Sequence, residues 1–340
     1  MPLKLYVSNS LTALSSRLGT SLQSRNYTVF QPFTIVTQTE GMSNWLTLEI
    51  AKKIGIAAHL QYKKPGAIIQ QVYRILGGSS SEVLSQQHMD WLIDQVLSSA
   101  EFQHIFKDKA AYFQEDPVTE TLKRMSLARR LADLFDQYQI YRSQIIRQWT
   151  ERPWNEAEPA FQWQAYIWQS LKKIAGDAIP DMTHLSHYIL DALKEPVKVK
   201  KLQQSLPEIN LFGLSIITQF HIRIFYELAE HIDLNFYLLN PAPDIYWIED
   251  RSEKEVIRLM AKYQSNSDML PTEGNALLTN WGKVLQHTFG MLYQTETFIN
   301  QQEEVAVHPP GRQTLLQKIQ DDIFHNLTET SELLPHDLED

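Results

Sequence analysis

Residues 34–58, TIVTQTEGMSNWLTLEIAKKIGIAA, decide the fold. The stretch begins as a short buried strand, turns at Thr39-Glu40-Gly41, and continues as an amphipathic helix that ends near Gly55. In open α/β sheets, side chains on a turn after a strand's carboxyl end face the ligand crevice. This turn carries polar residues but no reactive centre, so the pattern favours binding over catalysis.

The flanking sequence predicts a parallel sheet. Residues 4–8 (KLYVS) predict a first strand, and Asn9 or Ser10 caps the helix that follows. Strand signals return at 208–214 and 232–239, and the helix predicted over 218–231 joins them. Two strands joined by such a helix form a right-handed crossover in one sheet.

The middle of the chain has no strand signal. It predicts successive amphipathic helices over residues 67–76, 82–98, 119–141, 158–174 and 183–193. We therefore predict an α/β fold: a parallel-sheet domain, residues 1–64 plus 205–340, that is interrupted by an all-helical domain, residues 65–204.

Composition excludes several classes of protein. The chain has 340 residues, 43% of them hydrophobic, and no cysteine, which excludes disulfides, zinc-thiolate sites and a cysteine nucleophile. Residues 1–11 lack the apolar core of an export signal, and no apolar run approaches the roughly 20 residues of a membrane span. We expect a cytoplasmic protein without a membrane partner. The net charge of -9 argues against a protein that coats nucleic acid.

The sequence does not predict nucleotide hydrolysis or a metal centre. Residues 8–12, which follow the first strand, lack the glycines and lysine of a phosphate-binding loop, and Gly282-Lys283 lies in a helical segment. Asp133 and Asp136 could share a metal, but an ion pair between Arg129 and Asp133 is the more common arrangement. His184 and His187 have no third ligand nearby in sequence, so a solvated or capping pair is expected.

Aromatic residues are frequent in the helical block and could stack on bases. Their helical spacing predicts instead that most of them pack in the core. The residues concerned are Tyr138, Tyr141, Trp149, Trp154, Trp163, Tyr166 and Trp168.

Several segments together resemble one family, the RecC family, the gamma chain of bacterial exodeoxyribonuclease V. They are LYVSNSLTALSSRL, the 34–58 stretch, LADLFDQYQIYRSQIIRQW, WQAYIWQSL, the segment 211–241 and NALLTNWGKVL, and they occur in the same order over nearly the whole chain. Family members are considerably longer, so the resemblance is to their N-terminal portion.

The resemblance implies a superfamily 1 helicase-like (RecA-like) α/β domain with an inserted helical domain and no ATP site. It implies a non-catalytic subunit that splits duplex DNA, then guides one strand and scans it for the Chi sequence during recombinational repair of double-strand breaks. The implied partners are the beta and alpha chains, RecB and RecD, together with single-stranded and forked DNA. ATP and Mg²⁺ are then used by those partner chains, and this chain binds no cofactor.

The resemblance also implies a DNA-binding surface. The residues that match the family's pattern are Gln38, Asp133, Leu134, Asp136 and Arg142. Four further positions differ, because Glu40, Asn44, Lys64 and Gln70 stand where the best-known members have a threonine, a glutamine, a leucine and a tryptophan. These differences put recognition of the same Chi sequence in question.

Each matched residue also has a purely structural interpretation. Gln38 could fix the turn backbone, Leu134 lies on the apolar stripe of its helix, and Arg142 could cap that helix. Two other functions remain open from the sequence: an active ATP-dependent helicase on the same scaffold, and a protein-interaction module without direct DNA contact.

Overall fold

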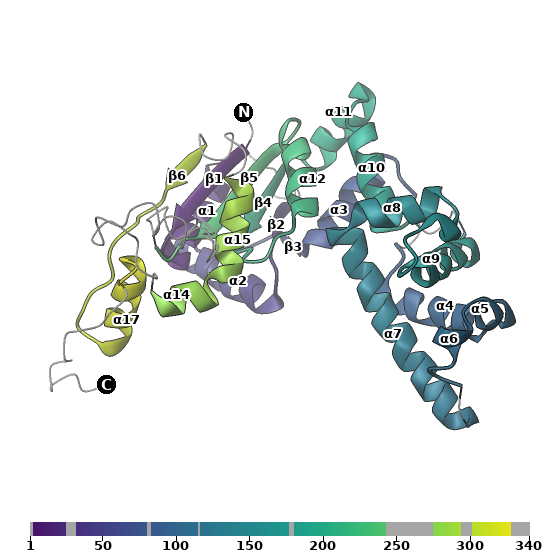
Figure 1. Ribbon diagram of the computed structural model, residues 1–340. Coiled ribbons are helices and arrows are strands. Elements are labelled where there is room, and N and C mark those ends of the chain that lie inside the picture. Colours follow the sequence, from purple (N-terminus) through teal and green to yellow (C-terminus); the bar gives the residue numbers. More distant parts are fainter. Residues whose placement is uncertain are drawn as a thin grey trace, which may run out of the picture. The chain divides into compact units, whose positions relative to one another are not determined.

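The computed structural model describes residues 3–24, 32–79, 83–114, 116–176, 180–242, 275–293 and 301–327 (Figure 1). The chain divides into two compact units. Unit 1 comprises Met1–Ile68 and Gln203–Asp340, and unit 2 comprises Ile69–Leu202. None of the described helices is both long and apolar enough to cross a membrane.

Unit 1 is built on a parallel sheet, which confirms the predicted α/β class. In the described residues its strands are β1 (Leu3–Ser8), β2 (Phe33–Val36), β3 (Leu60–Lys63), β4 (Glu208–Phe212), β5 (Asp233–Leu239) and β6 (Gln302–Glu304). Their order is β3-β2-β4-β5-β1-β6, and every pairing is parallel. The sequence did not predict β3 and β6. Both are short edge strands without a run of buried apolar residues.

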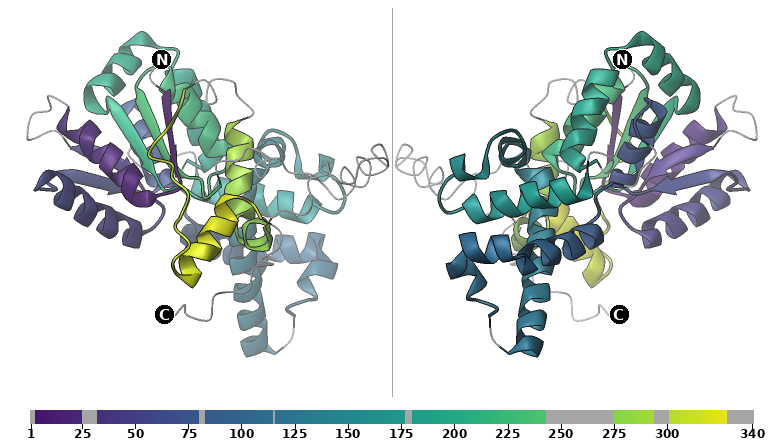
Figure 2. Two further views of the ribbon diagram at one scale, coloured as in Figure 1. Left: turned by 90° about the vertical axis from the view of Figure 1, so that its left-hand side faces the viewer. Right: turned by 90° about the vertical axis from the view of Figure 1, so that its right-hand side faces the viewer.

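Helices cover both faces of this sheet (Figure 2). The connections through α1 (Leu11–Gln23) and α2 (Glu40–Ile54) run toward the β3 edge, whereas the connection through α12 (Gln219–Ala229) runs the other way, from β4 to β5. Because parallel crossovers are right-handed, helices on connections of opposite direction lie on opposite faces. The helices α14 (Ala276–Trp281), α15 (Lys283–Leu292) and α17 (Leu315–Phe324) complete the described part of unit 1, and α15 packs on α12.

The core between the sheet and the α1–α2 layer is aromatic in its centre. The ring of Tyr237 stacks on Tyr6 and Phe212, with centroid distances of 4.8 and 5.9 Å. Leu14, Leu18, Leu46 and Ile50 of the two helices cover these rings. On the opposite face, the ring of Phe225 in α12 meets the edge of Phe236. The interleaved apolar positions of strands and helices thus bury both faces of the sheet.

Unit 2 is helical. Its helices are α4 (Gln86–Ser98), α5 (Ala100–Ile105), α6 (Lys107–Ala110), α7 (Pro117–Tyr141), α8 (Ser143–Glu151), α9 (Gln162–Ala175) and α10 (Met182–Ala192), with a 3₁₀ turn at Trp154–Glu156. Two further helices, α3 (Pro65–Ile75) and α11 (Pro196–Ser205), contain the sequence boundaries between the units. The predicted helix over 82–98 begins only at Gln86, where Ser85 caps it, and the predicted helix over 158–174 begins at Gln162.

Most aromatic residues of unit 2 pack in its core, as expected. Trp168 and Trp149 both meet the ring of Phe135 edge to face, with centroid distances of 5.6 and 6.2 Å. Of the aromatic residues on α7, Tyr141 is the exception, because it is 65% exposed.

Two leucines of α2 test this packing. Leu46 is fully buried, whereas Leu48 is 62% exposed. We expect Leu46→Ala to lower the free energy of unfolding by about 2–5 kcal/mol, because it leaves a cavity. Leu48→Ala should change it by less than about 0.5 kcal/mol. Urea denaturation of both variants measures the difference, and equal losses would contradict the assigned face of α2.

Candidate functional site

The carboxyl ends of all described strands of unit 1 lie at one edge, because the strands are parallel. At this edge β2 and β4 are neighbours, and the helices that follow them cover opposite faces. Such a topological switch point leaves a crevice beyond the strand ends, where open α/β sheets bind ligands. The loops after β2 and β4 therefore border the candidate site.

The loop after β2 is held by its hydroxyl groups. Thr39 caps α2 by accepting a hydrogen bond from the Met42 amide at 3.2 Å, and the hydroxyls of Thr37 and Ser43 lie 2.7 Å apart. The half-buried side chain of Gln38 makes no hydrogen bond with the described residues. Fixation of the turn thus does not depend on Gln38, and its amide is available to a ligand.

Three more of the predicted residues lie at the same edge. Glu40 and Asn44 are exposed and stand one turn apart at the start of α2. Lys64 is exposed and directly follows β3, the strand beside β2. The structure therefore brings Gln38, Glu40, Asn44 and Lys64 to one edge of unit 1.

The loop after β4 is the second border, and the sequence did not predict it. Gly213 has a φ of 64°, and a Cβ on it would lie 3.2 Å from the terminal carbon of Met42. The Thr288 hydroxyl on α15 donates a hydrogen bond to the Ser215 carbonyl at 2.8 Å. The exposed side chains of Ser215 and Ile216 thus occupy a fixed loop beside α2. A glycine directly after the crossover's first strand was the available signal.

The first turn of unit 1, after β1, is closed by its own side chains. The Ser10 amide donates to the Ser8 hydroxyl at 3.1 Å, and the Ala13 amide donates to the Ser10 hydroxyl at 3.3 Å. The Asn9 side-chain amide donates to the His308 carbonyl at 2.6 Å and accepts from the His308 amide at 3.4 Å. The first two bonds engage backbone amides of the kind that a phosphate-binding loop directs at its ligand.

The other predicted residues belong to unit 2. Gln70 is half-buried on α3, and Asp133, Leu134 and Asp136 lie on α7. The structure brings Asp133 and Asp136 to one side of α7, where burial, and then the charge of Asp133, raise the pKa of Asp136. Two residues turn a helix through about 200°, so Leu134 lies nearly opposite Asp136. It packs against the core of unit 2.

The prediction of an ion pair between Arg129 and Asp133 is wrong. The Asp133 carboxylate instead accepts a hydrogen bond from the Gln137 side-chain amide at 2.9 Å. The two side chains are one turn apart on the exposed side of α7, so this bond competes directly with the pair to Arg129. Arg129 is exposed and has no ion pair with the residues that the structure describes.

Arg142 ends α7. Its amide donates to the Tyr138 carbonyl at 2.9 Å, and its guanidinium lies 5.3 Å from the centroid of the Tyr138 ring. Backbone capping is therefore independent of the side chain. The exposed guanidinium rests on an aromatic face and donates no hydrogen bond to the residues that the structure describes.

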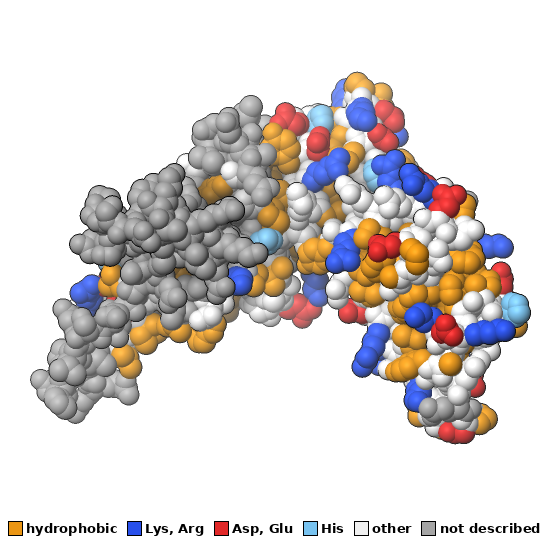
Figure 3. Space-filling view, viewed as in Figure 1, with side chains coloured by type: hydrophobic (Ala, Val, Ile, Leu, Met, Phe, Trp, Pro, Cys, Tyr) orange, Lys and Arg blue, Asp and Glu red, His pale blue; other side chains and the backbone are white. Residues whose placement is uncertain are grey.

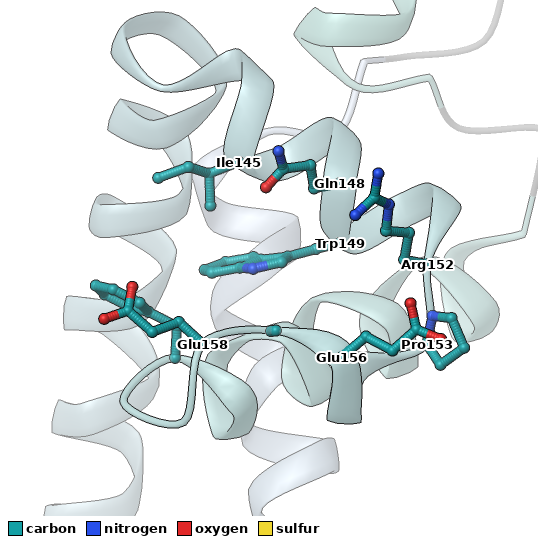
Figure 4. Close-up of a pocket in the computed structure, with 9 residues that line it drawn as sticks. Ile145, Gln148, Trp149, Arg152, Pro153, Glu156 and Glu158 are labelled. Atoms are coloured by element: carbon teal, nitrogen blue, oxygen red, sulfur yellow. The ribbon is translucent and has the colours of Figure 1, made fainter.

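A small pocket of about 140 Å³ lies between α8 and the 3₁₀ turn of unit 2 (Figure 4). Trp149 lines it but is only 4% exposed, so it offers little ring surface for a base to stack on. The carboxylates of Glu156 and Glu158 line it together with the Arg152 guanidinium, so acidic groups outnumber basic ones at the pocket. This lining does not favour a nucleic-acid strand.

His184 and His187 lie three residues apart on α10. The amide of His184 donates to the capping Asp181 carboxylate at 2.8 Å, and its ring lies edge to face with Tyr73. Within the described ranges, no group of three or more His, Asp or Glu residues is arranged to hold a metal ion.

The fold and site define a class: an α/β unit with a polar switch-point edge and a closed first turn, joined to a helical unit. The family profile described as RecC, N-terminal domain, matches residues 3–326. The chain belongs to this family. It is 25% identical to the RecBCD enzyme subunit RecC of Escherichia coli K12 over 95% of its own length and 30% of that protein.

Other relatives of the chain have the same name. The RecBCD enzyme subunit RecC of Haemophilus influenzae is 24% identical over 87% of the chain and 31% of the relative. That of Mycolicibacterium smegmatis is 26% identical over 63% of the chain and 19% of the relative. The chain thus spans about a third or less of the length of these relatives.

His221, at the start of α12, is expected to make the stability of unit 1 depend on pH. Burial lowers its pKa from 6.5 to about 4, and its Nδ1 lies 2.6 Å from the Thr218 hydroxyl. Between these pKa values the unfolded chain binds a proton that the folded chain does not, so stability falls as the pH falls through this window. We expect the free energy of unfolding to drop by at most about 3 kcal/mol more in the wild type than in His221→Gln.

Urea denaturation at pH 7, 5.5 and 4.5 measures this difference. The comparison cancels the contributions of carboxylates that titrate in both proteins. Parallel pH profiles would show that His221 protonates as freely in the folded chain as in the unfolded one.

Proposed function

We propose that the chain is a non-catalytic, DNA-guiding part of a RecBCD-type helicase-nuclease complex that acts in recombinational repair of double-strand breaks. Family membership supports this, and so do relatives whose name is RecBCD enzyme subunit RecC. In this proposal the chain separates duplex DNA and passes one single strand across its surface for scanning. Its protein partners are the beta and alpha chains, RecB and RecD.

The amide of Gln38 at the switch point, which forms no hydrogen bond with the described residues, carries the proposal. An amide can donate to and accept from one base edge at once, which is the contact that reads a base. Asn44 offers a second amide, Glu40 can accept from a base amine, and Lys64 can neutralise a phosphate. One cation beside one carboxylate gives little phosphate-driven affinity, so this edge suits a strand that other subunits drive past it.

The helical unit supplies different contacts. The Arg142 guanidinium lies over the Tyr138 ring and can pair with a phosphate or with the edge of a guanine. Asp133 and Asp136 would repel phosphate, so in this proposal they accept hydrogen bonds from base amines. Gln70 replaces a tryptophan of the best-known members and can form hydrogen bonds where that residue would stack. We therefore propose a sequence preference different from Chi as those members read it.

We further propose that unit 1 is a helicase-like (RecA-like) scaffold without a nucleotide site, and that unit 2 is its helical insertion. The closed turn after β1 supports this, because the Ser8 and Ser10 hydroxyls engage the Ser10 and Ala13 amides, which would otherwise be open to phosphate. ATP, Mg²⁺ and DNA cleavage then belong to the partner chains, and this chain binds no cofactor itself.

Substitution of the two best-placed residues tests the function. In the full-length protein assembled with its partner chains, we expect Gln38→Ala and Arg142→Ala each to weaken sequence-dependent regulation of the nuclease about tenfold, since one base contact contributes about 1–3 kcal/mol. Overall unwinding should stay within about twofold, because other subunits drive it.

Matched control variants distinguish a specific effect at the proposed site from a general effect of substituting an exposed residue. Gln95 and Arg223 are exposed residues of the same types on α4 and α12, and Gln95→Ala and Arg223→Ala should leave regulation unchanged. If all four variants regulate like the wild type, the assigned residues do not read DNA.

A further inference from the structure

Tyr141 is the last residue of α7, and it is 65% exposed. Within the described residues its ring contacts no other ring and no cation, and its hydroxyl forms no hydrogen bond. Tyr138, three residues earlier, is buried, and its ring meets Trp149 edge to face. The core of unit 2 therefore uses the ring of Tyr138 and leaves that of Tyr141 outside.

Arg142 is the neighbour of this exposed ring. Its Cα atom lies about 3.8 Å from that of Tyr141, and its guanidinium lies over the Tyr138 ring, 5.3 Å from the centroid. Residues three apart on a helix are neighbours on its surface, so Tyr138 and Tyr141 stand side by side. An exposed guanidinium and an exposed ring thus meet at the end of α7.

Net charge does not select a ligand for this place, but the ring does. Basic and acidic side chains are interspersed over the visible face of unit 2 (Figure 3). Asp136 is five residues before Tyr141, which places it about 140° around the helix. Asp133 is about two turns away and accepts its hydrogen bond from Gln137. The chemistry next to Tyr141 is therefore that of an aromatic face with one guanidinium.

A single strand of nucleic acid fits this pair of groups. Every base has a π-face that can stack on an aromatic side chain, and every nucleotide has a phosphate that a guanidinium can bind. Gln137 and Gln144, before and after Tyr141 in the sequence, are exposed and polar. The ring is therefore not part of a contiguous apolar surface of the kind that marks a protein contact.

We propose that Tyr141 stacks on one base of the scanned strand while Arg142 binds a phosphate or base edge beside it. This contact rests on the proposed DNA-guiding function and deepens it, because it names how the strand is held. Stacking accepts any base, so Tyr141 holds the strand in register and leaves the reading of base identity to other groups. Tyr141 is in this sense a positioning residue.

Photo-crosslinking of the full-length protein, assembled with its partner chains, tests the contact. The probe is forked DNA with an extended single strand that carries 5-iodouracil at one position at a time, because this base crosslinks to a ring on which it stacks. Mass spectrometry locates the crosslinked residue, and we expect Tyr141. Tyr112 is the matched control, since it is 56% exposed in the same unit with Lys123 5.9 Å from its ring, and it should not crosslink.

Regulation of the nuclease gives a second measurement. We expect Tyr141→Ala to weaken sequence-dependent regulation about fivefold or more, and Tyr141→Phe, which keeps the ring, to regulate within about twofold of the wild type. Tyr112→Ala should leave regulation unchanged. Arg142→Ala should also reduce the dependence on salt, whereas Tyr141→Ala should not, because stacking releases no counterion. Circular dichroism confirms that each variant is folded.

The possible failures are distinguishable. Crosslinks to other residues of the chain but none to Tyr141, with normal regulation in Tyr141→Ala, would overturn the stacking contact and leave the proposed function standing. No crosslink to the chain from any probe position would overturn both. Loss of a partner chain from the assembled complex in Tyr141→Ala, but not in Tyr112→Ala, would show that the ring docks a protein and would also overturn the stacking contact.

Discussion

Parallel pairing of the strands is the constraint on which the rest of unit 1 depends. It places every described strand's carboxyl end at one edge, and the opposite directions of the α2 and α12 connections open that edge between β2 and β4. Stacked rings of Tyr6, Tyr237 and Phe212 fix the sheet beneath it. Among the described residues, Gln38 therefore need not form a hydrogen bond to hold the fold, because hydroxyl groups fix the loop around it.

The sequence predicted what regular periodicity encodes. The strands β1, β2, β4 and β5 and the long helix α7 were evident, because buried apolar positions repeat along them. The short edge strands β3 and β6 and the loop after β4 were not evident from the sequence, because their positions depend on neighbours that are distant in sequence. Likewise, the pattern placed Gln38 and Glu40 on a ligand-facing turn, but it could not show that hydroxyls of Thr37, Thr39 and Ser43 hold this turn.

The same limit explains the error at Asp133. Spacing alone allowed partners one turn away in either direction, and Gln137 rather than Arg129 provides the bond. Arg129 has no ion pair with the residues that the structure describes. The carboxyl-terminal end of α7, with Arg142 over the Tyr138 ring, is the part of this helix that is proposed to meet DNA.

We propose that this α/β unit serves as a scaffold whose first turn, closed by Ser8, Asn9 and Ser10, holds no nucleotide. Isothermal titration calorimetry of the folded chain with ATP and Mg²⁺ tests it most directly. The account predicts no saturable heat at any ratio of nucleotide to protein. Stoichiometric binding that is lost when the turn after β1 is substituted would contradict it and would favour an active motor.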